Sequence, residues 1–126
     1  MNLMFILVET LFYFALAIQA GPGRVVELVL PRDLSANEGV VLEVKLGAIA
    51  SGAEIEIETK TGRTLGVISP HGIRAGNEAG TYVVPVPPEV IANNRVSVRL
   101  IHSFQSRRRA PTNKEVKDIR LKITPR

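Results

Sequence analysis

The chain has 126 residues and no Cys, which excludes disulfides, thiolate catalysis and Cys-ligated zinc sites. It has no Trp, and four of its six aromatic residues fall within the first twenty, so a binding platform of stacked aromatic rings is excluded for the remainder. The formal net charge of +4 is uneven: residues 107–126 carry eight Lys or Arg and two acidic side chains, whereas residues 1–106 carry eight and ten.

The first segment, residues 3–20, is apolar apart from three polar side chains, Glu9, Thr10 and Gln19. As an α-helix it would be about 27 Å long, just enough to cross the hydrocarbon core of a bilayer. Its uninterrupted apolar part, residues 11–18, has the length typical of a signal peptide. Residues 15–17, Ala-Leu-Ala, offer the small-x-small pattern that a signal peptidase requires, and Gly-Pro-Gly at 21–23 ends any helix.

Three interpretations of this segment stay open. Glu9 would cost about 2.5–3.5 kcal/mol near a bilayer centre, which disfavours a permanent span. No Lys or Arg precedes it, which disfavours a standard signal peptide unless translation begins further upstream. Residues 5–9, FILVE, resemble the Phe-x-x-x-Glu opening of type IV pilins, although Met4 stands where that pattern has Gly. We expect residues 1–20 to be a signal peptide or membrane anchor, and residues 21–126 to be one domain.

From Arg24 onward the apolar residues recur with a period of two, the spacing of half-buried strands. Pro85 favours an edge position for its strand or the end of that strand, and residues 87–94 have room for a single helical turn. The expected fold is all-β: an antiparallel seven-stranded β-sandwich, immunoglobulin-like or jelly-roll-like, preceded by an N-terminal hydrophobic helix. The predicted strands are 24–30, 40–46, 53–59, 64–69, 81–86, 95–101 and 116–124.

An acidic row follows from this alternation, because Glu54, Glu56 and Glu58 would share the outer face of one strand. Successive members would lie about 7 Å apart, too far to bind one cation without other ligands. A solvated sheet face accounts for them better than a calcium site does.

The strongest candidate for a binding site is the predicted loop 106–114, SRRRAPTNK. Three consecutive arginines form a compact cationic patch that suits phosphate, sulfate or carboxylate groups. The loop could also serve only to increase solubility and cap a sheet edge. Without interleaved aromatics or a nucleic-acid motif, nucleic acid is disfavoured as the partner. The predicted ligand- or partner-binding residues are Arg95, Arg99, Arg107, Arg108, Arg109 and Lys114.

A catalytic site would have to draw on the 69–80 loop and on the strand end at His102. The weak candidates are His71, Arg74, Glu78, Tyr82 and His102, of which Tyr82 is the one residue able to stack on a sugar ring. A metal-dependent or hydrolytic enzyme would need the loop and the strand end to meet in space. No nucleophile elbow, phosphate-binding loop or ligand-spaced His pair occurs. We therefore expect no catalytic residue, no metal and no cofactor.

The function predicted from the sequence is that of a non-catalytic, extracytoplasmic β-sandwich module, either periplasmic, secreted or anchored by the N-terminal helix. It would bind a protein partner or an anionic component of the cell envelope, such as a lipid headgroup or an acidic glycan. Membrane contact is expected only through residues 1–20, if these are not cleaved. The alternative is a small metal-dependent or hydrolytic enzyme that uses the 69–80 loop.

Overall fold

The structure, a computed structural model, describes residues 22–74 and 76–126, so the predicted N-terminal helix lies outside the described residues. No helix long and apolar enough to span a bilayer occurs within these two stretches. The elements are β1 (Arg24–Val29), β2 (Glu38–Leu46), β3 (Glu54–Thr59), β4 (Thr64–Ile68), β5 (Gly80–Val86), the 3₁₀ turn η1 (Pro88–Val90), β6 (Arg95–Phe104), β7 (Arg107–Arg109) and β8 (Val116–Pro125).

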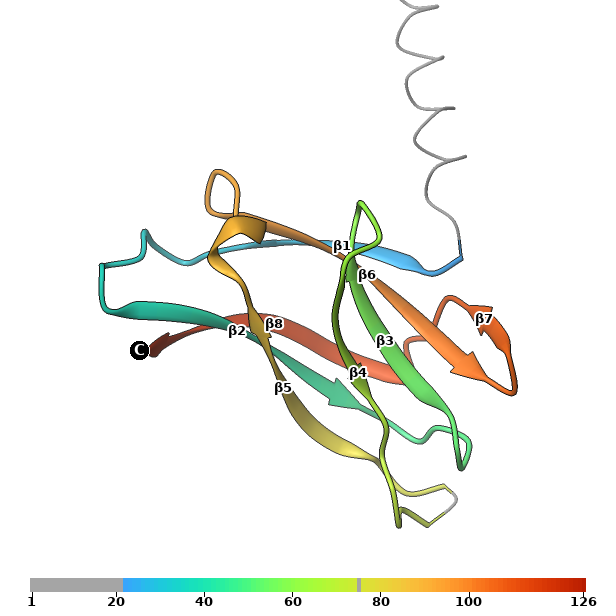
Figure 1. Ribbon diagram of the computed structural model, residues 1–126. Coiled ribbons are helices and arrows are strands. Elements are labelled where there is room, and N and C mark those ends of the chain that lie inside the picture. The colour runs from blue at the N-terminus through green and yellow to red at the C-terminus, as the bar shows by residue number, and fades with distance from the viewer. Residues whose placement is uncertain (1–21, 75) are drawn as a thin grey trace, which may run out of the picture.

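The strands form two antiparallel sheets that pack against each other (Figure 1). The five-stranded sheet has the order β1-β6-β3-β4, with β7 paired to β6. The three-stranded sheet has the order β5-β2-β8. The chain crosses between the sheets at residues 30–37, 47–53, 69–79, 87–94 and 110–115. The all-β, antiparallel, two-sheet part of the prediction is therefore confirmed.

The core lies between the sheets and follows from the period of two in the strands. From β2, the side chains of Val40, Leu42, Val44 and Leu46 are at most 4% exposed, as the alternation predicts. Alternate residues of β3 and β6 complete the same cluster from the opposite sheet. Burial of each such aliphatic side chain contributes about 1.5–3 kcal/mol relative to its exposure. The hydrophobic contact between the two sheets therefore holds them together.

The number of strands differs from the prediction of seven, because the chain continues as strand where a loop was expected. Strand β6 extends to Phe104, and β7 then pairs with its last three residues. Gln105 and Ser106 form a two-residue turn with φ of 50° and 65°, the positive values that the tightest hairpins require. All three β7 side chains are exposed, so no apolar residue marks this strand in the sequence. The described chain therefore has eight strands.

Two smaller expectations are confirmed. Pro85 lies in β5, which forms an edge of the three-stranded sheet. A single 3₁₀ turn, η1, occupies the segment 87–94.

Gly47, directly after β2, fixes the position of the crossing at 110–115. Its N–H donates to the carbonyl oxygen of Glu115 over 2.9 Å, and its own carbonyl accepts from the N–H of Ala79 over 3.0 Å. A Cβ at this position would lie 1.9 Å from the carbonyl oxygen of Lys114. The backbone of the 110–115 crossing can approach β2 this closely only because residue 47 has no side chain.

We predict that Gly47→Ala lowers the free energy of unfolding by about 1–3 kcal/mol, because the added methyl group forces the crossing away from β2. Gly39→Ala, within β2 itself, is the matched control, since the atom nearest to its added Cβ, Arg126 Cγ, would be 3.6 Å away. Urea unfolding of the two variants tests this. Equal losses of stability would contradict it.

Candidate functional site

The acidic row of β3 is paired with arginines of the predicted binding cluster. Glu58 lies opposite Arg99 of β6, and their side chains form an ion pair at 3.3 Å that is only 14% and 10% exposed. Arg108 of β7 reaches Glu56 at 3.3 Å and Glu58 at 3.8 Å. The third member, Glu54, accepts a hydrogen bond from the Ser69 hydroxyl. The acidic row and the basic cluster therefore compensate each other on the outer face of the five-stranded sheet.

A second carboxylate, Glu115, holds the next arginine. The guanidinium of Arg109 donates to both of its oxygens over 2.7 and 2.8 Å, and the Thr112 N–H donates over 2.9 Å. The buried ring of His102 places Nε2 at 3.3 Å from the same carboxylate. The Arg109 hydrogen bonds, assisted by the Thr112 N–H and by His102, lower the pKa of Glu115 to about 2. Glu115 thus ties β7, the end of β6 and the 110–115 crossing into one unit.

Strands β1 and β7 lie one after the other along the same edge of β6. Arg24 at the start of β1 faces Leu100, and Arg109 at the end of β7 faces His102. Because β3 pairs with residues 98–103 on the other edge, the chain enters the fold at the gap between β1 and β7. Two residues along β6 correspond to about 7 Å, so this entry point and β7 are immediate neighbours.

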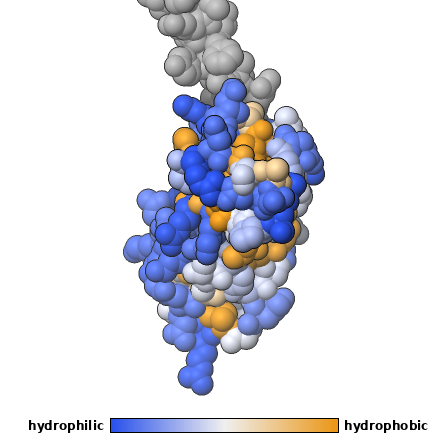
Figure 2. Space-filling view, turned by 90° about the vertical axis from the view of Figure 1, so that its left-hand side faces the viewer, coloured by the Kyte–Doolittle hydropathy of each residue, from blue (hydrophilic) through white to orange (hydrophobic). Residues whose placement is uncertain are grey.

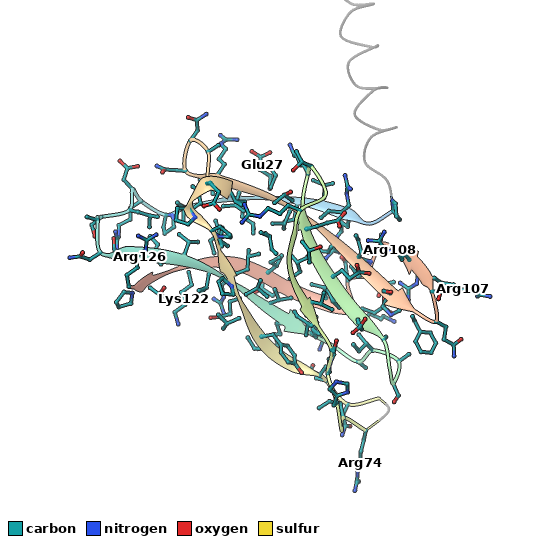
Figure 3. The ribbon with its side chains drawn as sticks, in the orientation of Figure 1. Glu27, Arg74, Arg107, Arg108, Lys122 and Arg126 are labelled. Carbon is teal, nitrogen blue, oxygen red and sulfur yellow. The ribbon has the colours of Figure 1, made fainter. Side chains whose placement is uncertain are left out.

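In this region three cations have no carboxylate partner among residues 22–74 and 76–126: Arg24 at the entry point, Lys114 in the 110–115 crossing, and Arg107 at the β6–β7 hairpin. Arg24 donates to the neutral Asn113 side chain over 2.6 Å, which joins β1 to the 110–115 crossing. Arg107 and Lys114 are exposed, and Arg107 projects outward from the β6–β7 hairpin (Figure 3). We call these three residues the basic end. Part of the predicted cluster is thus available to an anionic ligand.

The two predicted arginines on β6 have other positions. Arg95 lies at the opposite end of β6, nine residues from the hairpin, and donates to Glu27 over 2.9 Å. It lines an open pocket of about 440 Å³ between β1, the β3–β4 turn and η1. Arg99 is 8% exposed and paired with Glu58, as described above. The structure therefore does not bring Arg95 to the cluster, and it covers Arg99.

The five weak candidates do not share a pocket in the described chain. His71 lines a small hollow with residues 49–52 and 70–73, which does not include His102. Glu78 forms an ion pair with Lys117, and Arg74 points away from the molecule (Figure 3). The Tyr82 hydroxyl donates to the carbonyl oxygen of Ala79 over 2.7 Å, and its ring packs against the core. Among the described residues, no group of three His, Cys, Asp or Glu is placed to hold a metal ion.

A groove of about 450 Å³ runs between the free edges of β4 and β5. The exposed side chains of Val67 and Val83 flank it, and Gly66 lets the two edges approach, since a Cβ there would lie 2.9 Å from Val84 Cγ1. On the side of the molecule that lies to the left in Figure 1, the surface is mostly hydrophilic with small, separate apolar areas (Figure 2). Besides the basic end, this groove is a second possible binding surface, because its two free strand edges could pair with a strand of a partner.

The sequence did not point to Glu115, Arg24 or Gly47, whose contacts hold the 110–115 crossing in place at the basic end. One signal was available: residues 112–115 read Thr-x-x-Glu, the pattern of a capping box. Its two reciprocal hydrogen bonds are present here without a helix, from Thr112 N–H to the Glu115 carboxylate and from Glu115 N–H to the Thr112 hydroxyl. The contacts of Arg24 and Gly47 depend on long-range strand register, for which the sequence carries no comparable signal.

Comparison of the chain with models of known protein families, with curated proteins and with solved structures gave no match.

We predict that Glu115→Gln lowers the free energy of unfolding at pH 7 by about 2 kcal/mol, because charge-assisted hydrogen bonds from Arg109 and Thr112 are lost. The pKa of Glu115 is depressed from 4.5 to about 2, so its contribution is complete above about pH 5 and is lost as the pH falls toward 2. The stability difference between the wild type and the variant should shrink over the same range. Glu89→Gln, which affects an exposed ion pair, is the control and should change little. A difference that does not vary with pH would contradict the assignment.

Proposed function

We propose that this protein is a non-catalytic module of the cell envelope that works outside the cytoplasm and binds an anionic component through its basic end. The proposal is supported by one observation: some of the neighbouring cations have carboxylate partners and others do not. Arg108 and Arg109 are held by carboxylates, whereas Arg24, Arg107 and Lys114 have no carboxylate partner in the described chain. The paired arginines fix the β6–β7 hairpin and the 110–115 crossing, and the exposed Arg107 and Lys114 remain available to a ligand.

The geometry of the hairpin turn supports a binding role at this end. Gln105 and Ser106 both have positive φ, a conformation that is costly for residues other than Gly and Asn. Such turns persist where the surroundings fix them, and they are concentrated in ligand-binding segments. Here the ion pairs of Arg108 and Arg109 supply the constraint. Arg107 is therefore presented on a rigid turn and not on a free loop.

An anionic partner suits these side chains better than an apolar or aromatic one. Guanidinium groups donate in pairs to phosphate, sulfate and carboxylate groups, and an ammonium group adds a point charge. Stacking on a sugar ring is disfavoured, because Tyr82, the one aromatic candidate for it, has its hydroxyl bonded to Ala79 and its ring against the core. Nucleic acid is disfavoured by the same lack of aromatic side chains.

The finer fold assignment that we propose is immunoglobulin-like, not jelly-roll-like. In the immunoglobulin fold, strands A, B, E and D form one sheet and C, F and G the other. The neighbours β2 and β5 correspond to B and E, and β3 and β6 correspond to C and F. β8 then lies beside β2 where strand A is found, and β1 lies beside β6 where strand G is found. The strand order supports an immunoglobulin-like core whose first and last strands have exchanged places.

The test is the affinity of the full chain, held in neutral detergent micelles, for heparin as a soluble polyanion at 150 mM salt. We expect the double variant Arg107→Ala/Lys114→Ala to bind about three- to tenfold more weakly, because two uncompensated contacts are lost. The matched control is Lys60→Ala/Arg74→Ala, which removes the same charge from exposed positions elsewhere. Isothermal titration calorimetry measures both.

Equal losses of heparin affinity in the two double variants would mean that only net charge matters, and would overturn the proposal. No measurable binding by the wild type would overturn it as well. Recovery of a stoichiometric protein from an envelope extract by the double variant and the wild type alike would instead assign the function to a protein partner.

A further inference from the structure

The point at which the chain enters the fold decides which surface any N-terminal anchor would hold against a membrane. Gly23, with φ of +123°, lies directly on β6: a Cβ there would be 2.8 Å from Arg99 Cγ and 2.9 Å from Ile101 Cγ1. The chain is therefore held against β6 in the gap before β1 begins. This gap is bordered by β7 and by the 110–115 crossing, which Arg24 contacts through Asn113.

The tether between this point and the apolar segment is short. Only residues 21 and 22 separate Gly23 from Ala20, the last residue of that segment. Three peptide units span at most about 11 Å when fully extended. A bilayer that contains residues 3–20 would therefore lie within about a Debye length of the surface around Gly23, where charges on lipid headgroups are still felt.

Two cations of the basic end lie beside this surface, and the third, Arg107, lies opposite Phe104, about 10 Å further along β6. Arg24 is the first residue of β1, Lys114 is adjacent to the Asn113 that Arg24 contacts, and Arg107 lies on β7 along the same edge of β6. The carboxylate of Glu115, which follows Lys114 in the chain, is engaged by Arg109 and Thr112. The far end of β1 leads into residues 31–37, where Arg32 is paired with Glu38 and Asp33 accepts a hydrogen bond from Asn94.

We propose that residues 1–20 are retained as an anchor and that the basic end faces an anionic lipid surface, which holds the sandwich upright on the membrane. The proposal rests on the proposed function and names its ligand as lipid headgroups. Glu9 weakens the apolar segment as an anchor, and cations beside an anionic membrane would add a second, electrostatic attraction. Each cation close to an anionic membrane strengthens binding about fivefold, so Arg24, Arg107 and Lys114 together supply about a hundredfold.

The absence of native Cys allows a direct test of orientation. Ala110→Cys and Ala36→Cys are matched variants, because both replace an exposed Ala, one after β7 at the basic end and one in the 31–37 crossing at the far end of β1. Each full-length variant is labelled with an environment-sensitive fluorophore and reconstituted into vesicles of phosphatidylcholine, with or without one-third phosphatidylglycerol. Quenching by spin-labelled headgroups then reports which label lies near the membrane surface.

We expect quenching of the Ala110→Cys label to be several times that of the Ala36→Cys label in vesicles with phosphatidylglycerol. This difference should shrink, without disappearing, when Arg107→Ala/Lys114→Ala is added, because the short tether still holds the Gly23 side near the bilayer. Equal quenching of the two labels, or a difference independent of phosphatidylglycerol, would overturn the orientation. The N-terminal residue of the protein isolated from its native cells is the second measurement, and cleavage at or before residue 20 would overturn retention of the anchor. If either result overturns the anchor proposal, heparin binding by the wild type still supports the proposed function. If the wild type does not bind heparin, both proposals fail.

Discussion

The structure depends on β6, because this strand pairs with three others and determines where each of them begins or ends. Its first half pairs with β1 on one edge, its last three residues pair with β7 on the same edge, and β3 occupies the other edge. An antiparallel strand has only two edges on which to form hydrogen bonds, so β1 and β7 must share one of them. The alternation of β6 then sends Val96, Val98 and Leu100 into the core and the intervening residues to the outer face. The position of the chain entry and the position of the basic hairpin follow from this single constraint.

The same constraint explains why the basic residues near the C-terminus are not a free patch. Cross-strand pairing sets Glu58 opposite Arg99, and the return of the chain as β7 carries Arg108 over the acidic row. Partly buried pairs of this kind are weak evidence for stability, since desolvation offsets much of the attraction, but each fixes a geometry. The arginines of β7 are therefore arranged by charge pairing where other strands are arranged by burial. Near the chain entry and the β6–β7 hairpin, Arg24, Arg107 and Lys114 have no carboxylate partner in the described chain.

The parts of the fold that could be predicted from the sequence are those that burial alone determines. β2 and β3 alternate apolar and polar residues without interruption, so their presence and their buried faces were predictable, and their starts differ from the predicted ones by one or two residues. β7 buries no side chain, and a strand of three arginines carries no periodic signal. The partners of Arg109 and Arg24 could not be predicted, because Glu115 and Asn113 reach them only through the crossing between the sheets. Cross-sheet register of this kind is set by the whole set of pairings and is not encoded in any short segment.

The central claim is that three consecutive arginines have different tasks, and alanine substitutions at each of them test it most directly. Both the free energy of unfolding and the affinity for a soluble polyanion should be measured for Arg107→Ala, Arg108→Ala and Arg109→Ala. The account predicts that Arg107→Ala weakens binding and leaves stability unchanged, because its side chain is exposed and has no partner in the described chain. Arg108→Ala and Arg109→Ala should lower stability through the loss of their carboxylate pairs. The same loss of affinity and the same stability for all three variants would contradict it.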